Sequence, residues 1–251
     1  MSPQNNNNQS SLFGVLFFPV LAVGVLIIVA ILVMSYTGNK RTAPSPNSNI
    51  RQLSASTMNT LRHQYDKLGE SIGNPNAPVT IREFGDYQCP ACGNFEPTAE
   101  RIRKKYVDPG KVRFIFFDFP LAMHQHAQAA AIAARCAARQ DKFWPYHDRL
   151  YHTQSKWAEQ SNPSSMFLDL GVEVGLDTDK LKACMKNNTP LPTINKERDA
   201  GKLVKLRATP TVLVGNTEFI GGPSYDKLKN AIDDALSAAG ADGGSQGSAG
   251  Q

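Results

Sequence analysis

Two cysteines separated by two residues, Cys89-Pro-Ala-Cys92, constrain this chain more than any other feature. They follow an apolar stretch at residues 79–84 that predicts a strand, and they open a segment, ending at Tyr106, that predicts a helix. The partial positive charge of a helix N-terminus stabilises a thiolate there. Pro90 suits the first helical turn, where no N–H donor is needed. The pair therefore predicts a redox-active dithiol, although half of a zinc site has the same spacing.

Strands and helices alternate in the rest of the pattern. A second strand is expected at residues 111–118, where consecutive apolar residues indicate burial on both faces. Further helices are expected at residues 125–141, 143–151, 166–174, 178–187 and 191–205. Two short strands follow at 211–215 and 218–220, with a tight turn at Asn216, and then a last amphipathic helix at 224–236. The order is β-α-β, a helical insertion of about 80 residues, and β-β-α.

That order, with the two cysteines at the start of the first helix, is the order of the thioredoxin fold, an α/β fold. Five segments carry a closer resemblance. They are Glu83-Phe-Gly-Asp-Tyr-Gln-Cys-Pro-Ala-Cys92, Phe116-Phe-Asp-Phe-Pro-Leu121, Ala133-Ala-Arg-Cys-Ala137, Lys142-Phe-Trp-Pro-Tyr-His147 and Ala208-Thr-Pro-Thr-Val212. Together they resemble the DsbA family of disulfide oxidoreductases, and more closely its membrane-anchored, BdbD-like branch. The resemblance implies a thioredoxin domain at residues 69–237 with an inserted all-helical subdomain at about 122–205.

The resemblance assigns different roles to the two cysteines. Cys89 is expected to be the more exposed nucleophile, and Cys92 its buried partner in a redox-active disulfide. The implied chemistry is thiol–disulfide exchange through a mixed disulfide with a substrate, without a cofactor or a metal. Strong oxidases of the family often carry Pro-His between the cysteines, so Pro-Ala indicates oxidising character without ranking its strength. The zinc alternative needs two further ligands, which Cys136 and Cys184 would have to supply.

Thr209-Pro210 is expected to lie opposite the cysteines. In the resembling family the matching proline is cis and starts a strand. A cis X-Pro bond is uncommon and usually serves a definite purpose. Here it would expose the backbone groups of Thr209 to a substrate peptide, which can pair with them as a strand. The alternative is an ordinary trans proline at a strand start.

Glu83 lies six residues before Cys89, where the resembling family has a buried acid. A carboxyl group buried beneath the cysteines has a raised pKa and can exchange a proton with Cys92. The alternative is a surface residue on the strand. Arg82 and Glu83 are adjacent, so one of the two side chains is expected to face outward.

The remaining cysteines, Cys136 and Cys184, both fall in the helical insertion. A structural disulfide between them would close a loop of about 48 residues and stabilise the fold by up to about 4 kcal/mol. Such a bond requires an oxidising compartment. The alternative is two buried free thiols that pack as small apolar side chains. His124 and His126 are expected to pack at a helix entry rather than to act as ligands or as a general base.

An uncharged apolar run precedes the folded part and predicts a membrane anchor. It begins at Leu12, ends at Met34, and is long enough to cross a hydrocarbon core of about 30 Å. A cleavable signal peptide has a shorter apolar region behind a basic start. We therefore expect a retained single transmembrane helix at residues 12–36, between a disordered terminus at 1–11 and a linker and lead-in at 37–68. The Gly- and Ser-rich residues 238–251 are expected to form a disordered tail.

Charge bears on topology and on partners. Lys40 and Arg41 follow the apolar run, and the positive-inside rule alone would place the folded domain in the cytoplasm. Two charges are a weak indication, and the cysteine pattern favours a catalytic domain outside the cytoplasmic membrane. The net charge is +5, but the cluster Arg101-Ile-Arg-Lys-Lys105 has no interleaved aromatic residues, so nucleic-acid binding is not supported.

The predicted function is that of a membrane-anchored thiol–disulfide oxidoreductase that forms disulfides in exported proteins. The resemblance implies two kinds of partner: unfolded or folding exported proteins with cysteines, and a quinone-linked, DsbB-like membrane protein that re-oxidises the enzyme. A disulfide reductase or isomerase on the same fold is the first alternative. A non-enzymatic peptide-binding module is the second, and the presence of both Cys89 and Cys92 argues against it.

Overall fold

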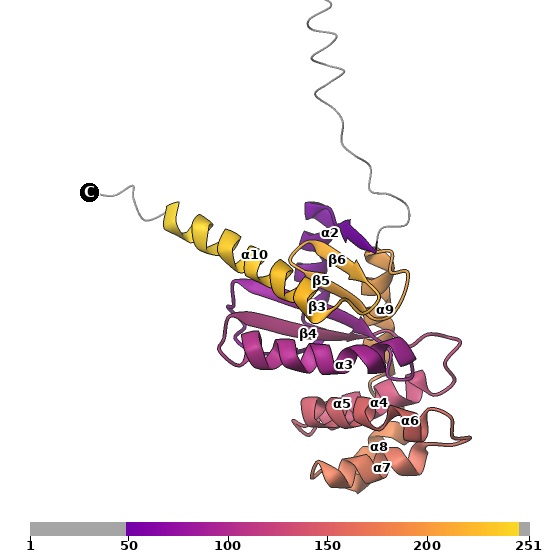
Figure 1. Ribbon diagram of the computed structural model, residues 1–251. Helices are drawn as coiled ribbons and strands as arrows, with labels where there is room; N and C mark the ends of the chain where they lie inside the picture. The colour runs from indigo at the N-terminus through magenta and orange to yellow at the C-terminus, as the bar shows by residue number, and fades with distance from the viewer. Residues whose placement is uncertain (1–48, 246–251) are drawn as a thin grey trace, which may run out of the picture. The chain divides into compact units, whose positions relative to one another are not determined.

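A computed structural model describes residues 49–245 of the chain, which form a mixed sheet covered by helices (Figure 1). The strands are β1 (Ile50–Gln52), β2 (Glu70–Ile72), β3 (Val79–Gly85), β4 (Val112–Asp118), β5 (Thr211–Val214) and β6 (Thr217–Ile220). They lie in the order β1-β6-β5-β3-β4-β2. β3 and β4 are parallel at the centre, and every other pair is antiparallel. The thioredoxin-fold core that the sequence predicts is confirmed, with β1 and β2 added at the two edges.

Helices cover both faces of this sheet. The helices of residues 49–245 are α2 (Ala55–Thr60), α3 (Pro90–Ile102), α4 (Ala127–Ala138), α5 (Phe143–His152), α6 (Gln154–Trp157), α7 (Ser164–Glu173), α8 (Thr178–Lys186), α9 (Leu191–Leu203) and α10 (Tyr225–Ser245), with π-helical turns η1 (Leu61–Tyr65) and η2 (Arg103–Val107). α3 and α10 pack on one face, where Ile81, Ile102 and Ile232 share a core. α9 and the segment of α2 and η1 pack on the other. α4 to α9 form the predicted helical insertion, which is confirmed.

Cover on both faces explains why β3 is buried along nearly its whole length. Side chains alternate along a strand, so Ile81 and Glu83 face α3 while Arg82 and Phe84 face the opposite side. The expectation that either Arg82 or Glu83 faces outward is wrong, because both side chains are buried. Arg82 is neutralised by Asp66, whose carboxylate accepts hydrogen bonds from Nε at 2.7 Å and Nη2 at 2.5 Å.

The N-terminal lead-in joins the domain earlier than the sequence predicts. β1 pairs with β6, with Ile50 opposite Phe219, and Ser54 then caps α2 by accepting a hydrogen bond from the Thr57 N–H. Leu61 is fully buried beneath the sheet. The predicted linker at residues 37–68 is therefore corrected from residue 50 onward. A three-residue edge strand gains its stability from backbone pairing, so its side chains show too short a pattern to reveal it.

The C-terminal helix is longer than predicted. α10 runs from Tyr225 to Ser245, whereas the sequence predicts a disordered tail from residue 238. Leu228 and Ile232 pack the first turns of the helix into the core. Alanines at 235, 238, 239 and 241 then continue it, because alanine has the highest helix propensity. The tail prediction is corrected for residues 238–245.

The predicted membrane anchor, from Leu12 to Met34, lies outside the described residues. Within residues 49–245, none of the helices combines the length and the apolar character that crossing a bilayer requires.

Arg135 of α4 fastens the helical insertion to the sheet. Its buried guanidinium donates hydrogen bonds to Asp118 at the end of β4, to Glu70 of β2 and to Glu197 of α9. Burial of a charge is costly unless it is paired and hydrogen-bonded, and here three carboxylates surround one cation. The insertion is thus held at a defined position on the edge of the sheet.

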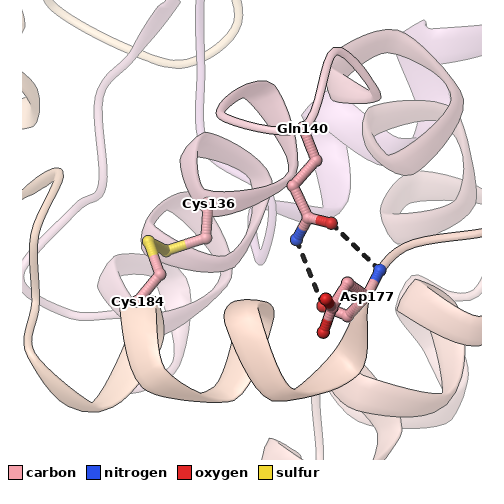
Figure 2. Close-up of a disulfide and its surroundings, with 4 residues drawn as sticks. All are labelled: Cys136, Gln140, Asp177 and Cys184. Atoms are coloured by element: carbon pink, nitrogen blue, oxygen red, sulfur yellow. Dashed lines mark hydrogen bonds between the residues drawn. A yellow bond between two sulfur atoms is a disulfide. The ribbon is translucent and has the colours of Figure 1, made fainter.

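A disulfide between Cys136 and Cys184 joins α4 to α8 inside the insertion, with a Cα–Cα distance of 5.8 Å (Figure 2). Two residues past the end of α4, Gln140 forms two hydrogen bonds with the backbone of Asp177, the residue that caps α8. Figure 2 shows that the covalent and the polar connection lie side by side. Because these two cysteines are bonded to each other, their thiolates do not complete a zinc site with Cys89 and Cys92.

Replacing both bonded cysteines, as Cys136→Ala with Cys184→Ala, is expected to lower the free energy of unfolding by about 3 kcal/mol. The disulfide spans 48 residues, and a loop of that size restricts the unfolded chain substantially. Urea denaturation of the double variant and the wild-type protein, without reductant, measures the difference. Equal midpoints and slopes for the two proteins would contradict a stabilising role for this bond.

Candidate active site

Cys89 occupies the N-cap position of α3, four residues after the end of β3, and Pro90 is the first helical residue. The Cys89 carbonyl accepts hydrogen bonds from the N–H groups of Cys92 at 3.0 Å and Gly93 at 3.1 Å, which start the helix. Both cysteines are free thiols in this structure. Cys89 keeps 7% of its surface exposed and Cys92 none, so only the first thiol is open to a substrate.

The environment of Cys89 favours its thiolate. A hydrogen bond from the Cys92 thiol is the largest cause that lowers the pKa of Cys89 to about 5, against an ordinary value of 9.0. The backbone N–H groups of Cys92 and Ala91, at the start of the helix, lower it further, while partial burial opposes them. At neutral pH, Cys89 is therefore ionised in the reduced protein and is a strong nucleophile or a good leaving group.

The environment of Cys92 has the opposite effect. Complete burial raises the pKa of the Cys92 thiol well above its usual value, and the neighbouring Cys89 raises it further. The Asp86 N–H donates a weak hydrogen bond to Cys92 Sγ at 3.5 Å. Two chemically identical side chains thus acquire separate properties: Cys89 is a thiolate with a small exposed area, and Cys92 is a protonated thiol beneath it.

Thr209 and Pro210 lie against the thiols, although about 120 residues separate them from Cys89 in the sequence. The peptide bond between them is cis, and β5 begins at the next residue, Thr211. The Thr209 carbonyl oxygen lies 3.4 Å from Cys89 Sγ. The structure therefore brings together the two segments that the sequence analysis places in one site.

Glu83 lies beneath the thiols, fully buried on the α3 side of β3. Burial is the main cause that raises the pKa of Glu83 to about 8; the Glu96 charge adds to this increase, and Arg103 opposes it. Neither carboxyl oxygen has a hydrogen-bond partner among the described residues. The charge of Glu83 also helps raise the pKa of Cys92, so the two groups are electrostatically coupled. A group with this pKa can hold or release a proton near neutral pH.

A buried polar cluster lies beside Glu83 that the sequence does not predict. Arg103 Nη2 donates hydrogen bonds of 2.7 Å to Glu96 Oε1 and to Asp148 Oδ1. His147 Nε2 lies 3.4 Å from the second Glu96 oxygen. Glu96, His147 and Asp148 have the spacing of a metal site, with one ligand atom of each within 4.8 Å of the others, but Arg103 already donates a hydrogen bond to one oxygen of each carboxylate. Glu96 follows Cys92 by four residues, so helical periodicity places it on the buried face of α3, and this signal could have revealed it.

Asp86 and His124 shape the approach to Cys89. The Asp86 carboxylate accepts hydrogen bonds from the N–H groups of Gln88 and Leu121, both at 2.8 Å, and contacts His124 Nδ1 at 2.7 Å. His124 therefore links the segment before α4 to the active-site loop. This geometry agrees with packing at a helix entry, rather than with a ligand or a general base.

Alkylation of the reduced protein by iodoacetamide is expected to be half-maximal near pH 5. Only the thiolate reacts, and its fraction rises as the pH rises through the Cys89 pKa of about 5. Peptide mapping should find the label on Cys89 and not on the buried Cys92. In a Cys92→Ala variant the half-maximum should move to higher pH, because the largest stabilising hydrogen bond is gone. A wild-type half-maximum above pH 8 would show that the thiolate is not stabilised.

Comparison with known proteins agrees with this geometry. The family model described as thioredoxin matches residues 67–234, more than half of the chain. A probable disulfide bond formation protein D of Bacillus anthracis is 28% identical over 235 residues, which cover 92% of this chain and 98% of the relative. Disulfide bond formation protein D of Bacillus subtilis is 28% identical over 170 residues, which cover 66% and 76%.

Solved structures give the same result. Oxidised BdbD from Bacillus subtilis has a TM-score of 0.62 and 28% identity, with 68% of this chain and 94% of that chain covered. The thiol-disulfide exchange protein α-DsbA2 from Wolbachia pipientis shares the fold, with a TM-score of 0.60, 21% identity, and 71% and 95% covered. The chain therefore belongs to the thioredoxin family and, within it, to the DsbA-like protein thiol–disulfide oxidoreductases.

Proposed function

We propose that this oxidoreductase forms disulfide bonds in exported proteins by exchange at Cys89 and Cys92. The contrast between the two thiols carries the proposal: the Cys89 pKa is lowered to about 5, and the Cys92 pKa is raised. A stabilised thiolate favours the reduced form of the pair, so the corresponding disulfide is a strong oxidant. This contrast supports oxidation of substrates over their reduction.

The proposed cycle begins with the Cys89–Cys92 disulfide. A substrate thiolate attacks Cys89 Sγ, the internal S–S bond breaks, and a mixed disulfide forms between the substrate and Cys89. Cys92 leaves as a thiolate and takes a proton, for which the protonated Glu83 carboxyl, with its raised pKa, is the proposed donor. A second substrate thiolate attacks the substrate sulfur of the mixed disulfide. The substrate disulfide leaves with Cys89 as the thiolate, and two electrons remain on the enzyme.

The reduced pair must return its two electrons before another cycle. We propose that a quinone-linked, DsbB-like membrane protein accepts them, and that Thr209 presents its backbone to the substrate peptide during exchange. The names of the Bacillus relatives support a role in disulfide formation.

The proposed location is the outer side of the cytoplasmic membrane, with residues 12–34 as the anchor. The apolar run supports the anchor, and the Cys136–Cys184 disulfide supports an oxidising compartment. A membrane-impermeant amine reagent applied to intact cells should label the lysines of the catalytic domain. Labelling that occurs only after lysis would place the domain in the cytoplasm and overturn this part of the proposal.

The direction of electron flow is tested by equilibrating the protein with glutathione buffers and measuring the fraction of the Cys89–Cys92 pair that is oxidised. A reduction potential near about −120 mV identifies an oxidase, as proposed. A value near about −270 mV identifies a thioredoxin-like reductase and contradicts the proposal.

A further inference from the structure

A single glutamine connects the helical insertion to the backbone of the active site. Gln154, the first residue of α6, donates hydrogen bonds from Nε2 to the carbonyl oxygens of Tyr87 at 2.7 Å and Cys89 at 2.9 Å. The Cys89 carbonyl oxygen also accepts hydrogen bonds from the N–H groups of Cys92 and Gly93 in the first turn of α3. Gln154 thus adds a third donor to the oxygen that defines the start of the helix.

The backbone behind Gln154 is firmly placed. Trp157, at the end of the same short helix, is fully buried, and its Nε1 donates to the Leu150 carbonyl at 2.9 Å. Thr153, the residue before Gln154, is buried and donates to the Arg149 carbonyl at 2.7 Å. The side-chain amide therefore reaches the active-site loop from a fixed point in the insertion.

The first turn of α3 leaves room for this amide. A Cβ atom at Gly93 would lie 2.5 Å from Gln154 Oε1, closer than van der Waals contact allows. The absence of a side chain at Gly93 thus permits Gln154 to pack against the helix beside Cys89. Gln88, in the active-site loop, makes a second connection to the insertion. Its Nε2 donates a hydrogen bond to the Ala158 carbonyl, and its Oε1 accepts one from the His126 N–H.

We infer that Gln154 is a positioning residue for the redox pair: its amide, bound to the Tyr87 and Cys89 carbonyls, holds the loop so that the N–H groups of α3 point at Cys89 Sγ. This inference rests on the proposed role of Cys89 and Cys92. It makes the helical insertion part of the redox site, because the residue that holds the nucleophile's backbone comes from outside the thioredoxin core.

Gln154→Met tests the contact by removing the two donors while keeping the side-chain length. The expected result is a rise of about 1 unit in the pH at which the Cys89 thiolate absorbance at 240 nm is half-maximal. At pH 7, raising the Cys89 pKa from about 5 to about 6 lowers about ninefold the factor by which ionisation favours the reduced protein. The pair should then oxidise glutathione with an equilibrium constant roughly tenfold lower, which corresponds to about 30 mV.

Gly93→Ala tests the same contact from the opposite side. The added methyl group displaces the Gln154 amide without altering Gln154 itself. Alone, it should raise the half-maximal pH as Gln154→Met does. In the double variant the two changes should not add, because both remove one interaction. Full additivity would show that Gly93→Ala acts by another route.

Gln160→Met is the matched control, because within residues 49–245 its side-chain amide hydrogen-bonds only to the Lys156 carbonyl oxygen and the Met166 sulfur, both in the insertion. Thermal unfolding of each variant separates positioning from general destabilisation. A shift in absorbance with an unchanged unfolding midpoint supports the inference. An unchanged titration in Gln154→Met overturns it, provided that the wild-type protein shows a thiolate near pH 5. A wild-type protein without such a thiolate, or without exchange, would overturn the proposed function instead.

Discussion

Replacing Cys89 with serine is expected to lower the rate of substrate oxidation by about a thousandfold or more. The substrate thiolate attacks the sulfur of Cys89, and a hydroxyl group neither forms the disulfide nor leaves as a stable anion at neutral pH. The measurement is the oxidation of a reduced two-cysteine peptide by the pre-oxidised protein, followed by separation of the two peptide forms.

Two further variants make this result specific. Cys92→Ser keeps the Cys89 thiol but cannot hold the internal disulfide. When it is mixed with the disulfide form of the peptide, its Cys89 thiolate should attack that disulfide and displace one peptide thiolate. The mixed disulfide on Cys89 should then accumulate and be visible by mass spectrometry, because no Cys92 thiol is present to release the peptide. The Cys136→Ala/Cys184→Ala variant should retain exchange at temperatures where it is folded. Peptide oxidation by Cys89→Ser at the wild-type rate would place the chemistry elsewhere in the chain.

Glu83→Gln is expected to stabilise the protein by up to about 5 kcal/mol above pH 8, and by little below pH 4.5. The fold raises the pKa of Glu83 from 4.5 to about 8, chiefly through burial. The stability contributed by the protonated carboxyl is therefore fully present below pH 4.5 and is lost as the pH rises through about 8. Each pKa unit corresponds to about 1.4 kcal/mol, and a glutamine amide avoids the loss because it does not ionise.

Urea denaturation of Glu83→Gln and the wild-type protein at pH 5, 7 and 9 measures this difference. The exposed carboxyl of Glu159 provides a matched control, and Glu159→Gln should show no comparable dependence on pH. A constant difference between Glu83→Gln and the wild-type protein at all three pH values would contradict a raised pKa. The same variant lacks the proposed proton donor for Cys92. Substrate thiolates should therefore attack its Cys89–Cys92 disulfide more slowly at neutral pH.

The redox pair could be predicted from local chemistry, because two thiols between a predicted strand and a predicted helix indicate thiol–disulfide exchange. Glu83 and the cis Thr209-Pro210 bond are implied instead by the resemblance to the DsbA family. Arg82 shows the limit of this reasoning, because alternation along a strand says which side chains share a face but not whether helices cover both faces. Asp66, its partner, comes from a segment that the sequence analysis treats as a lead-in.

The residues that were missed depend on contacts between distant segments. Glu96 could have been found from its helical spacing, but its partner Arg103 meets Asp148 only after the insertion folds against α3. Gln154 carries no motif at all, since an amide donor becomes informative only when the carbonyl it reaches is known. β1 is too short to show a pattern and is defined by the edge that it extends.

The bond between Cys136 and Cys184 has a consequence for the life of each molecule. A newly made chain has four thiols, and two of them must be joined, to each other and not to Cys89 or Cys92, before α4 and α8 are fastened. That step requires an electron acceptor from outside the nascent chain. Each copy of this enzyme therefore needs one disulfide formed within itself before it reaches its full stability, and its supply depends on an oxidant outside the chain.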